Sequence, residues 1–558
     1  MADASGDCHL VFNGEIYNFQ EIRKQLEARG HCFRSTSDTE VLVEAYRAWG
    51  TDCLGRLNGM FAFALYDDRR RQLFAARDRA GEKPLFYSHA QGRLSFGSEL
   101  KALMADPAIS RQVDPQALES YLAFGYVPHD GCMLRGVRKL PAAHAMLYDI
   151  AEDRLKTWQY WHLPEPASGR APHQQALVDE LEHHLFESVR LRLIADVPVG
   201  IMLSGGVDSS LVTAMAARLN PRVKTFTISF PGHAAFDEAP FARTVADHFG
   251  TEHVVLAAEP AAVDLLPELA RQYDEPLADS SMVPMALISR LIRQEATVAL
   301  GGDGGDELFG GYPHHSWAQS QARLRALIPA VTGPWLRAGM KKALPVGFRG
   351  RNYLLGLTGD LPFALGQFNQ WFDFDTRRRL LGGRAPAGGA PERLKASLGC
   401  ASGTPLQQVT AVDFRSYLPD DILAKVDRAS MLHSLEVRAP WLDHRLVEFA
   451  FRVPDALRAT AGARKILPRR LAERLLPRSM DLTRKQGFSL PLDAWFAGAW
   501  GNFTRQVLTD PGQTTFDRGV IDSLLAGQER GRVNMHRLFA LTMFELWRRE
   551  YRATVSQS

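Results

Sequence analysis

Cysteine is scarce in this chain of 558 residues, and no two cysteines form a CxxC pair. Cysteines so sparse and widely spaced exclude a disulfide framework and a structural zinc site. The first residues, MADASGD, lack the apolar core of a signal peptide. The longest apolar runs, such as that at 60–66, are far too short to span a bilayer. These absences predict a soluble, cytoplasmic protein; the cysteines are Cys8, Cys32, Cys53, Cys132 and Cys400.

A strong excess of charge of either sign is also missing. The chain has 66 lysine and arginine residues and 63 aspartate and glutamate residues, which leaves a net charge of +3. A balance this close gives no electrostatic case for nucleic acid or for a membrane as a partner. The histidines form no ligand-spaced metal cluster; the adjacent pairs at 183–184 and 314–315 are expected on a helix face and in a loop.

The length favours two domains, because a single hydrophobic core rarely grows beyond about 250–300 residues. From residue 9 to about 160, short apolar strands alternate with turns, and helical spacing is present at 19–30 and 38–50. We place a first domain at 1–163, a linker rich in proline, glycine and alanine at 164–175, and a second domain at 176–558.

The second domain has a different pattern. VPVGIML, VKTFTISF, EHVVL and TVALG are short β-rich segments separated by helical patterns, which is typical of a parallel α/β sheet. From about residue 315 onward the pattern is mainly helical, with a glycine- and proline-rich break at 382–392.

One loop in this domain has the features of a phosphate site. In VGIMLSGGVDSSLVTAMAARL, an apolar strand leads into Ser204-Gly205-Gly206, and a helix begins near 208–210. Glycines let the backbone approach an anion closely, and a helix start offers free N–H donors. Two glycines alone would indicate only a turn entering a helix. The lysine of a Walker loop is missing, which disfavours transfer of a γ-phosphate.

A second loop, ALGGDGGDELFGGY at 299–312, follows the strand-like segment TVAL. Glycines alone would indicate a mobile surface loop, but the spacing of two aspartates among them, Asp303 and Asp306, does not fit that interpretation. Carboxylates can lie beside phosphates only where a divalent cation offsets the repulsion. The loop therefore predicts Mg²⁺.

Together these motifs resemble those of the asparagine synthetases, whose loop SGGVDSS binds pyrophosphate. By this resemblance Asp208 and Asp306 hold Mg²⁺, and Asp303 assists amide formation, although some members have glutamate there. RKQGFSLPLDAW at 484–495 resembles a late loop whose lysine, Lys485, stabilises charge during adenylation. DEPLADSS at 274–281 and the stretch at 420–444 resemble the walls of the substrate site. The resemblance assigns ATP binding to Met202, Ser204, Gly205, Gly206, Asp208, Ser209, Ser210, Ile228, Gly301 and Gly302.

The amino-terminal part resembles class II glutamine amidotransferases. FNGEIYN at 12–18 and STSDTEVL at 35–42 are similar to the glutamine pocket of that family. The resemblance implies that Asn13 and Gly14 form an oxyanion hole, and that Asn13, Glu15 and Asp38 bind glutamine.

This part departs from the family at its start. The family uses an amino-terminal cysteine as nucleophile, whereas this chain begins with Met1-Ala2-Asp3. Cys8 is expected to be a buried, inert thiol. We hypothesise that Met1 is an internal methionine of a longer protein. The 558-residue form is then expected to have a poorly stable first domain, with unpaired strand edges, and no glutaminase activity.

The predicted architecture is an α/β plus α+β two-domain fold. An incomplete α/β sandwich of the amino-terminal-nucleophile type precedes an α/β synthetase domain of the adenine-nucleotide hydrolase (PP-loop) type with a helical carboxyl-terminal part. The predicted enzyme is a ligase that makes asparagine, AMP and pyrophosphate from aspartate, ATP and ammonia, with glutamine as the ammonia source in the intact family.

Two alternatives remain. One is a related amidotransferase that acts on another carboxylate, in a surface sugar, a peptide or an antibiotic precursor. The other is a catalytically silent binding homologue. The expected partners are small molecules, with no nucleic acid and no membrane, and the sequence is compatible with a homodimer.

Overall fold

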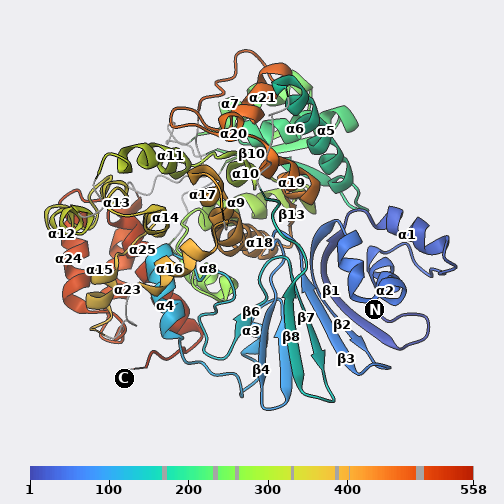
Figure 1. Cartoon of the computed structure of the whole chain (residues 1–558), viewed down its shortest axis with the longest axis horizontal. Coiled ribbons are helices and arrows are strands. Elements are labelled where there is room, and N and C mark those ends of the chain that lie inside the picture. The colour runs from blue at the N-terminus through green and yellow to red at the C-terminus, as the bar shows by residue number, and fades with distance from the viewer. Residues whose placement is uncertain are drawn as a thin grey trace.

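The computed structural model has an antiparallel β sandwich at its amino-terminal end and a parallel α/β domain with a helical carboxyl-terminal part (Figure 1). This agrees with the two-domain fold class predicted from the sequence. The residues that the structure describes are 1–165, 173–229, 237–257, 263–328, 332–383, 389–400, 402–484 and 495–556.

The larger amino-terminal sheet is antiparallel in the order β1-β2-β3-β7-β8. Side chains alternate between its faces along β2. Phe61 and Phe63 belong to a cluster with the helices α1 and α2, whereas Ala62 and Ala64 pack toward the smaller sheet β5-β4-β6. The strands are β1 (Cys8–Ile16), β2 (Gly59–Asp67), β3 (Gln72–Arg77), β4 (Phe86–Ala90), β5 (Arg93–Gly97), β6 (Arg138–Lys139), β7 (His144–Asp149) and β8 (Arg154–Gln159).

Both helices predicted in this region are present. They are α1 (Phe19–Glu27) and α2 (Asp38–Trp49). The hydroxyl oxygen of Ser37 accepts from the Thr39 N–H and caps α2, which Gly50 ends with a positive φ of 57°.

The second domain contains the parallel sheet expected from its apolar segments, in the order β11-β10-β9-β12-β13. The last strand, β13, was not predicted from the sequence. The carboxyl ends of β9 and β12 meet at one edge of the sheet, and both glycine-rich motifs follow these ends. The strands are β9 (Val199–Met202), β10 (Lys224–Ser229), β11 (Glu252–Ala257), β12 (Val298–Leu300) and β13 (Glu436–Arg438).

Helices cover this sheet and make up most of the chain beyond residue 305, as predicted. Near the sheet are α5 (Gln174–Arg192), α6 (Val207–Leu219), α7 (Ala239–Phe249), α8 (Leu265–Tyr273) and α9 (Met282–Ile292). Later helices are α10 (Gly305–Phe309), α11 (Pro313–Arg325), α12 (Gly333–Ala343), α13 (Arg351–Gly356), α14 (Leu361–Gln367), α15 (Phe374–Leu380), α16 (Ala390–Ser397), α17 (Pro405–Val412), a π-helix (Asp413–Ile422), α18 (Leu423–Met431), α19 (His444–Arg452), α20 (Asp455–Arg458), α21 (Ile466–Leu475), α23 (Ala499–Thr509), α24 (Arg518–Glu529) and α25 (Met535–Glu550).

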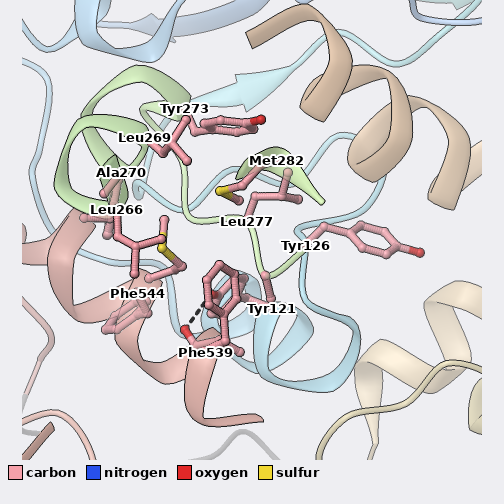
Figure 2. Close-up of a cluster of buried hydrophobic side chains, with 14 of the residues drawn as sticks. Tyr121, Tyr126, Leu266, Leu269, Ala270, Tyr273, Leu277, Met282, Phe539 and Phe544 are labelled. Carbon is pink, nitrogen blue, oxygen red and sulfur yellow. Dashed lines mark hydrogen bonds between the residues drawn. The ribbon is translucent and has the colours of Figure 1, made fainter. Parts of the chain in front are cut away.

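A buried cluster joins distant parts of the chain (Figure 2). Helix α4 (Pro115–Phe124) contributes Tyr121, whose hydroxyl donates to the carbonyl oxygen of Ala540 in α25 at 2.7 Å. Phe544 of α25 and Leu266 of α8 lie in the same cluster. A segment from the first 163 residues therefore packs directly into the core of the helical part. Among the described helices, none has both the length and the apolar character needed to cross a bilayer.

Candidate functional site

A glycine-rich turn joins β9 to α6 at the carboxyl edge of the parallel sheet. The hydroxyl oxygens of Ser204 and Ser209 lie 3.0 Å apart, and the Ser204 N–H donates to Ser209 Oγ at 3.2 Å. The Gly206 N–H donates to Ser204 Oγ at 3.3 Å. These contacts fix the turn in front of the first turn of α6, where backbone N–H groups and the helix dipole favour an anion.

Two glycines lie here at places of close approach, and Gly205 is under the stronger constraint. Gly205 has φ of 71°, and a Cβ atom on it would lie 2.6 Å from Phe241 Cβ and 2.7 Å from the Ala242 nitrogen. A Cβ atom on Gly302 would lie 3.2 Å from the Ser209 nitrogen. The loop after β9 thus packs against α7 on one side and against the aspartate-rich loop on the other.

A lysine that the sequence analysis did not identify lies between the two predicted metal ligands. Lys465 Nζ contacts Asp208 Oδ2 and lies 2.7 Å from Asp306 Oδ1. Burial lowers the pKa of Lys465, but Asp208 and Asp306 more than offset this and hold its pKa above the ordinary value. Lys465 has a left-handed backbone with φ of 53°, and such strain is common at functional sites.

These loops line a cavity of about 240 Å³. The cavity is bounded by most of the predicted nucleotide and metal residues, namely Met202, Ser204, Gly206, Asp208, Ser209, Ile228, Gly301, Gly302, Asp303 and Asp306. Two predicted ATP-binding residues do not line it. Ser210 is fully buried, and Gly205 lies beneath the start of α7. Lys485 lies outside the described residues.

The donor set of this cavity fits a nucleotide with Mg²⁺. Asp208 and Asp306 already share one cation, the ammonium of Lys465, so their carboxylates are close enough to hold a metal ion together. Carboxylate oxygens beside phosphates are the ligands that Mg²⁺ uses at nucleotide sites. The apolar side chains of Met202, Phe226 and Ile228 line another part of the cavity and suit a heterocyclic base.

A second group of charges lies at another part of the cavity. Lys425 Nζ is 2.8 Å from Asp279 Oδ2 and lines the cavity together with Asp303. Burial raises the pKa of Asp303, and Lys425 partly offsets this effect. Burial also raises the pKa of Asp279, but Lys425 and Ser281 outweigh it and lower that pKa to about 2. Burial, together with the negative charge of Asp279, raises the pKa of Asp421.

Further charged residues of the cavity were also missed by sequence analysis. Glu238 is 6% exposed, and burial raises its pKa to about 8, although Arg484 lowers it. Arg464, Arg469 and Arg484 also line the cavity. The three arginines share no motif, and their signal in the sequence is an excess of arginine and lysine near 464–484, whereas Glu238 has no such signal.

The predicted glutamine pocket lies at the end of β1. The Asn13 side-chain amide donates to Ser98 Oγ at 3.1 Å, and Asp38 Oδ2 accepts from the Ile16 N–H at 2.9 Å. Gly14 has φ of 145°, and a Cβ atom on it would lie 2.0 Å from the carbonyl oxygen of Met60. Burial, then Asp38, raises the pKa of Glu15 to about 7.

Cys8 lies on the same strand as Asn13 but in a different environment. Its side chain is 6% exposed and belongs to the hydrophobic cluster beneath α1 and α2. Burial, followed by the charges of Asp67 and Asp3, raises the pKa of this thiol to about 11. A thiol with so high a pKa is a weak nucleophile at neutral pH. The expectation that Cys8 is a buried, inert thiol agrees with this environment.

One arginine contacts both predicted sites. Arg438 of β13 places Nη2 3.3 Å from Glu15 Oε2. The carbonyl oxygen of Arg438 accepts from the Gly301 N–H at 2.9 Å. The strand next to the nucleotide cavity is therefore tied to the end of β1.

The two histidine pairs differ in their surroundings. His183 and His184 lie on helix α5, as expected. The prediction of a loop for the second pair was wrong, because His314 and His315 are buried at the start of α11. Their Nε2 atoms lie 2.6 and 2.8 Å from Asp413 Oδ2, so the fold creates a cluster that the spacing did not show.

A structural hydrogen-bond network explains this cluster. The Tyr312 N–H donates to Nδ1 of His315 at 3.3 Å, so the ring proton of His315 resides on Nε2. Nε2 of His315 then donates to Asp413 Oδ2. Burial raises the pKa of Asp413, but His314 and His315 outweigh it and keep the carboxyl ionised.

Both halves of the chain match known protein families. The Asparagine synthase family matches residues 180–549, and the Glutamine amidotransferase domain family matches residues 1–161. Asparagine synthetase [glutamine-hydrolyzing] 1 of Bacillus subtilis is 31% identical over 512 residues, which cover 90% of this chain and 78% of that protein.

Two other relatives indicate the range of the similarity. A putative asparagine synthetase [glutamine-hydrolyzing] of Mycobacterium bovis is 35% identical over 500 residues, covering 87% of this chain and 75% of that protein. Amidase chry2 of Gibberella zeae is 28% identical over 507 residues, which cover 83% of this chain and 73% of that protein. With a glycine-rich nucleotide cavity, an aspartate-rich loop and a family match over most of its length, the chain belongs to the asparagine synthase family.

Proposed function

We propose that the chain is an asparagine synthetase that activates aspartate with ATP. A β-carboxylate oxygen of aspartate attacks the α-phosphorus, the bond from this phosphorus to the bridging oxygen breaks, and pyrophosphate leaves. Ammonia then attacks the acyl carbon of the aspartyl-AMP ester, the bond to AMP breaks, and the nitrogen loses one proton. The observation that carries the proposal is the shared cavity of Asp208, Asp306, Lys465 and Asp303.

Each side of the cavity has a defined task in this scheme. Backbone N–H groups at the start of α6 bind the pyrophosphate, and Mg²⁺ held by Asp208 and Asp306 would offset its charge. Lys465 supplies a further positive charge at the same place. By the family resemblance, Lys485 adds another during adenylation.

Asp303 is proposed to accept the proton that nitrogen loses in the second step. Its carboxyl group lines the cavity, and its raised pKa makes it a better base than an exposed aspartate. Lys425, held by Asp279, lies on the same side and can bind a carboxylate of the acceptor. An acceptor with a second carboxylate, as in aspartate, fits this cation.

The nitrogen donor proposed for the 558-residue chain is free ammonia. The geometry around Asn13, Gly14, Glu15 and Asp38 supports a glutamine pocket, but the environment of Cys8 makes this thiol unsuitable as the nucleophile of that pocket. Steady-state rates with ammonium chloride and with glutamine test this part. Equal rates with both donors would contradict it.

The main test is aspartate-dependent exchange of pyrophosphate into ATP in the presence of Mg²⁺, followed by quantification of asparagine and AMP after ammonia is added. Equal amounts of asparagine, AMP and pyrophosphate are expected. Failure to form AMP with any carboxylic acid would exclude the enzyme function.

A second candidate is an amidotransferase for another carboxylate, such as one in a surface sugar, a peptide or an antibiotic precursor. The observation that favours it is the 28% identity to Amidase chry2, a relative that is named an amidase and not an asparagine synthetase. Exchange that requires a carboxylic acid other than aspartate would support this candidate.

The third candidate is a catalytically silent binding homologue. The charged groups of the cavity, from Asp208 to Lys465, argue against it. ATP binding without exchange for any acid would support it.

A further inference from the structure

Helix α12 (Gly333–Ala343) turns its apolar side toward solvent, unlike an ordinary surface helix. At 100° per residue, Trp335 and Leu336 lie on one side of the helix, and Arg337 and Lys341 lie on the other. Trp335 is 81% exposed and Leu336 is 41% exposed, while only Gly333 of this helix is buried. A surface helix normally turns its apolar side toward the core.

The basic side of α12 is the side that contacts the protein. Arg337 Nε donates to Thr358 Oγ1 at 3.1 Å, and its guanidinium lies 3.7 Å from the centre of the Phe363 ring. Lys341 Nζ is 2.6 Å from Asp375 Oδ2. These contacts fix the rotation of α12, so that its tryptophan and leucine face away from the rest of the chain.

The segment at the end of α11 has further exposed apolar side chains. Leu327 is 79% exposed and Leu324 is 42% exposed. Arg325 Nη1 donates to the carbonyl oxygen of Asp360 at 3.4 Å, and Arg337 Nη2 donates to that of Thr358 at 3.1 Å. Both helices thus rest on the same short segment. We name the exposed group the α12 surface, and its residues are Leu324, Leu327, Trp335, Leu336 and Lys342.

The charge of this region is mainly positive, although Lys341 and Arg351 are paired with Asp375 and Asp373. Residues 308–359 include no aspartate and no glutamate, whereas the whole chain is close to balance. Lys342 forms no ion pair with the residues that the structure describes, and it flanks Trp335 on the helix. The lysines and arginines of 308–359 are Arg323, Arg325, Arg337, Lys341, Lys342, Arg349 and Arg351.

We propose that the α12 surface docks on an anionic lipid bilayer, with α12 in the plane of the headgroups and Trp335 and Leu336 at the boundary of the acyl chains. Exposed tryptophan and leucine beside lysine are characteristic of interfacial helices, and basic residues near an anionic leaflet add attraction. This surface is peripheral and needs no membrane span.

The same observations disfavour other partners. In a symmetric dimer the surface would face its own copy and bring like charges together. Nucleic-acid sites are more polar than a surface with three leucines and a tryptophan. The cores of protein–protein interfaces are poor in lysine. The near-neutral net charge of the whole chain, from which the sequence predicts no membrane partner, averages out this local excess.

The test uses the full chain and sedimentation with vesicles of phosphatidylcholine containing phosphatidylglycerol, or of phosphatidylcholine alone. We expect binding to the anionic vesicles that weakens with salt. Trp335→Glu is expected to reduce the partition coefficient about tenfold or more, because a carboxylate would replace the deepest apolar group. Lys342→Glu is expected to reduce it roughly fivefold or more.

Val533→Glu is the matched control, since Val533 is an apolar residue outside the α12 surface and is 47% exposed. It should bind vesicles like the unmodified chain, and all variants should retain their circular dichroism spectra. The proposal is overturned by absence of vesicle binding at low salt, by equal binding to both vesicle types, or by unchanged binding of Trp335→Glu. It is also overturned if the α12 substitutions instead change oligomeric state or RNA binding while vesicle binding is absent.

Discussion

Lys465 Nζ lies 2.7 Å from Asp306 Oδ1 and also contacts Asp208, although these residues come from three separate segments of the chain. The lysine lies in the cavity that the two glycine-rich loops form, where phosphates of a nucleotide would add negative charge. Its ammonium can therefore stabilise the two carboxylates in the free protein and, in the proposed reaction, the leaving pyrophosphate.

Replacing this lysine tests that dual role. Lys465→Met should lower aspartate-dependent pyrophosphate exchange by about 100-fold to 1,000-fold, which is typical for loss of one group that stabilises developing charge. Lys465→Arg should retain more activity, because it keeps the charge but changes its geometry. The control is the exposed Lys24→Met, which should behave like the unmodified chain. Exchange by Lys465→Met within a few-fold of normal would show that the lysine has no role in adenylation.

Asp303 should act after adenylation. Asp303→Asn should keep pyrophosphate exchange within a few-fold of normal but slow asparagine formation by about 100-fold, since a general base typically contributes this much or more. Because burial raises the pKa of Asp303, its basic form is lost at a higher pH than for an exposed aspartate. The rate of the second step should therefore fall as pH drops through this raised pKa, and Asp303→Asn should remove that dependence. Rapid-quench measurements of aspartyl-AMP decay with ammonia over a range of pH would show both effects.

The glycine-rich loops could be predicted from the sequence because their chemistry depends on adjacent residues. The turn at 204–206 and the aspartates at 303–306 each follow a short apolar strand, and both lie where such a pattern predicts. Lys465 could not be found in this way. It precedes helix α21 with no motif around it, and only the packing of that helix brings the ammonium into the cavity. Lys425, by contrast, lies in the stretch at 420–444, which the resemblance had marked as a wall of the substrate site.

The same reasoning applies to the fold. Strands β9 to β12 were predicted because each is an apolar run bounded by turns or helices. β13 spans only Glu436–Arg438 and includes two charged residues, which is too short and too polar for a periodic signal. The glycines and the proline before His314 and His315 are compatible with the predicted loop, but that proline begins helix α11.

Gly205 should tolerate no side chain. Gly205→Ala would place a Cβ atom 2.6 Å from Phe241 in a backbone with positive φ, so the turn or α7 must shift. We expect a loss of stability on the order of 1–3 kcal/mol and a much weaker affinity for ATP. Gly55→Ala is a matched control, because a Cβ atom there meets nothing within 4 Å. Thermal unfolding and ATP titration by calorimetry measure the two effects, and equal behaviour of both variants would contradict the role of close approach.

Cys8 should be dispensable. Cys8→Ser and Cys8→Ala keep a small side chain in the cluster beneath α1 and α2, and neither should change the rate with ammonia or with glutamine. Cys8→Ser should cost stability, about 1–3 kcal/mol, because it buries a hydroxyl group without an assured partner. The thiol should also resist iodoacetamide at pH 7, since its pKa is raised to about 11. Loss of glutamine-dependent activity in both variants, with ammonia-dependent activity intact, would identify Cys8 as a nucleophile after all.

Glu238 should make stability depend on pH. Its pKa is raised from the ordinary 4.5 to about 8 in the folded chain, so the folded state binds a proton more tightly than the unfolded state. The stabilisation from this proton is fully present below the unfolded pKa and is lost as pH rises through about 8. Glu238→Gln keeps the shape but cannot ionise, so its free energy of unfolding relative to the unmodified chain should rise between pH 5 and pH 9, by an amount on the order of 1–3 kcal/mol. Urea unfolding at both pH values, with the exposed Glu268→Gln as control, tests this directly. A difference between Glu238→Gln and the unmodified chain that stays constant with pH would mean that Glu238 is ionised at neutral pH, paired with Arg484 instead of protonated.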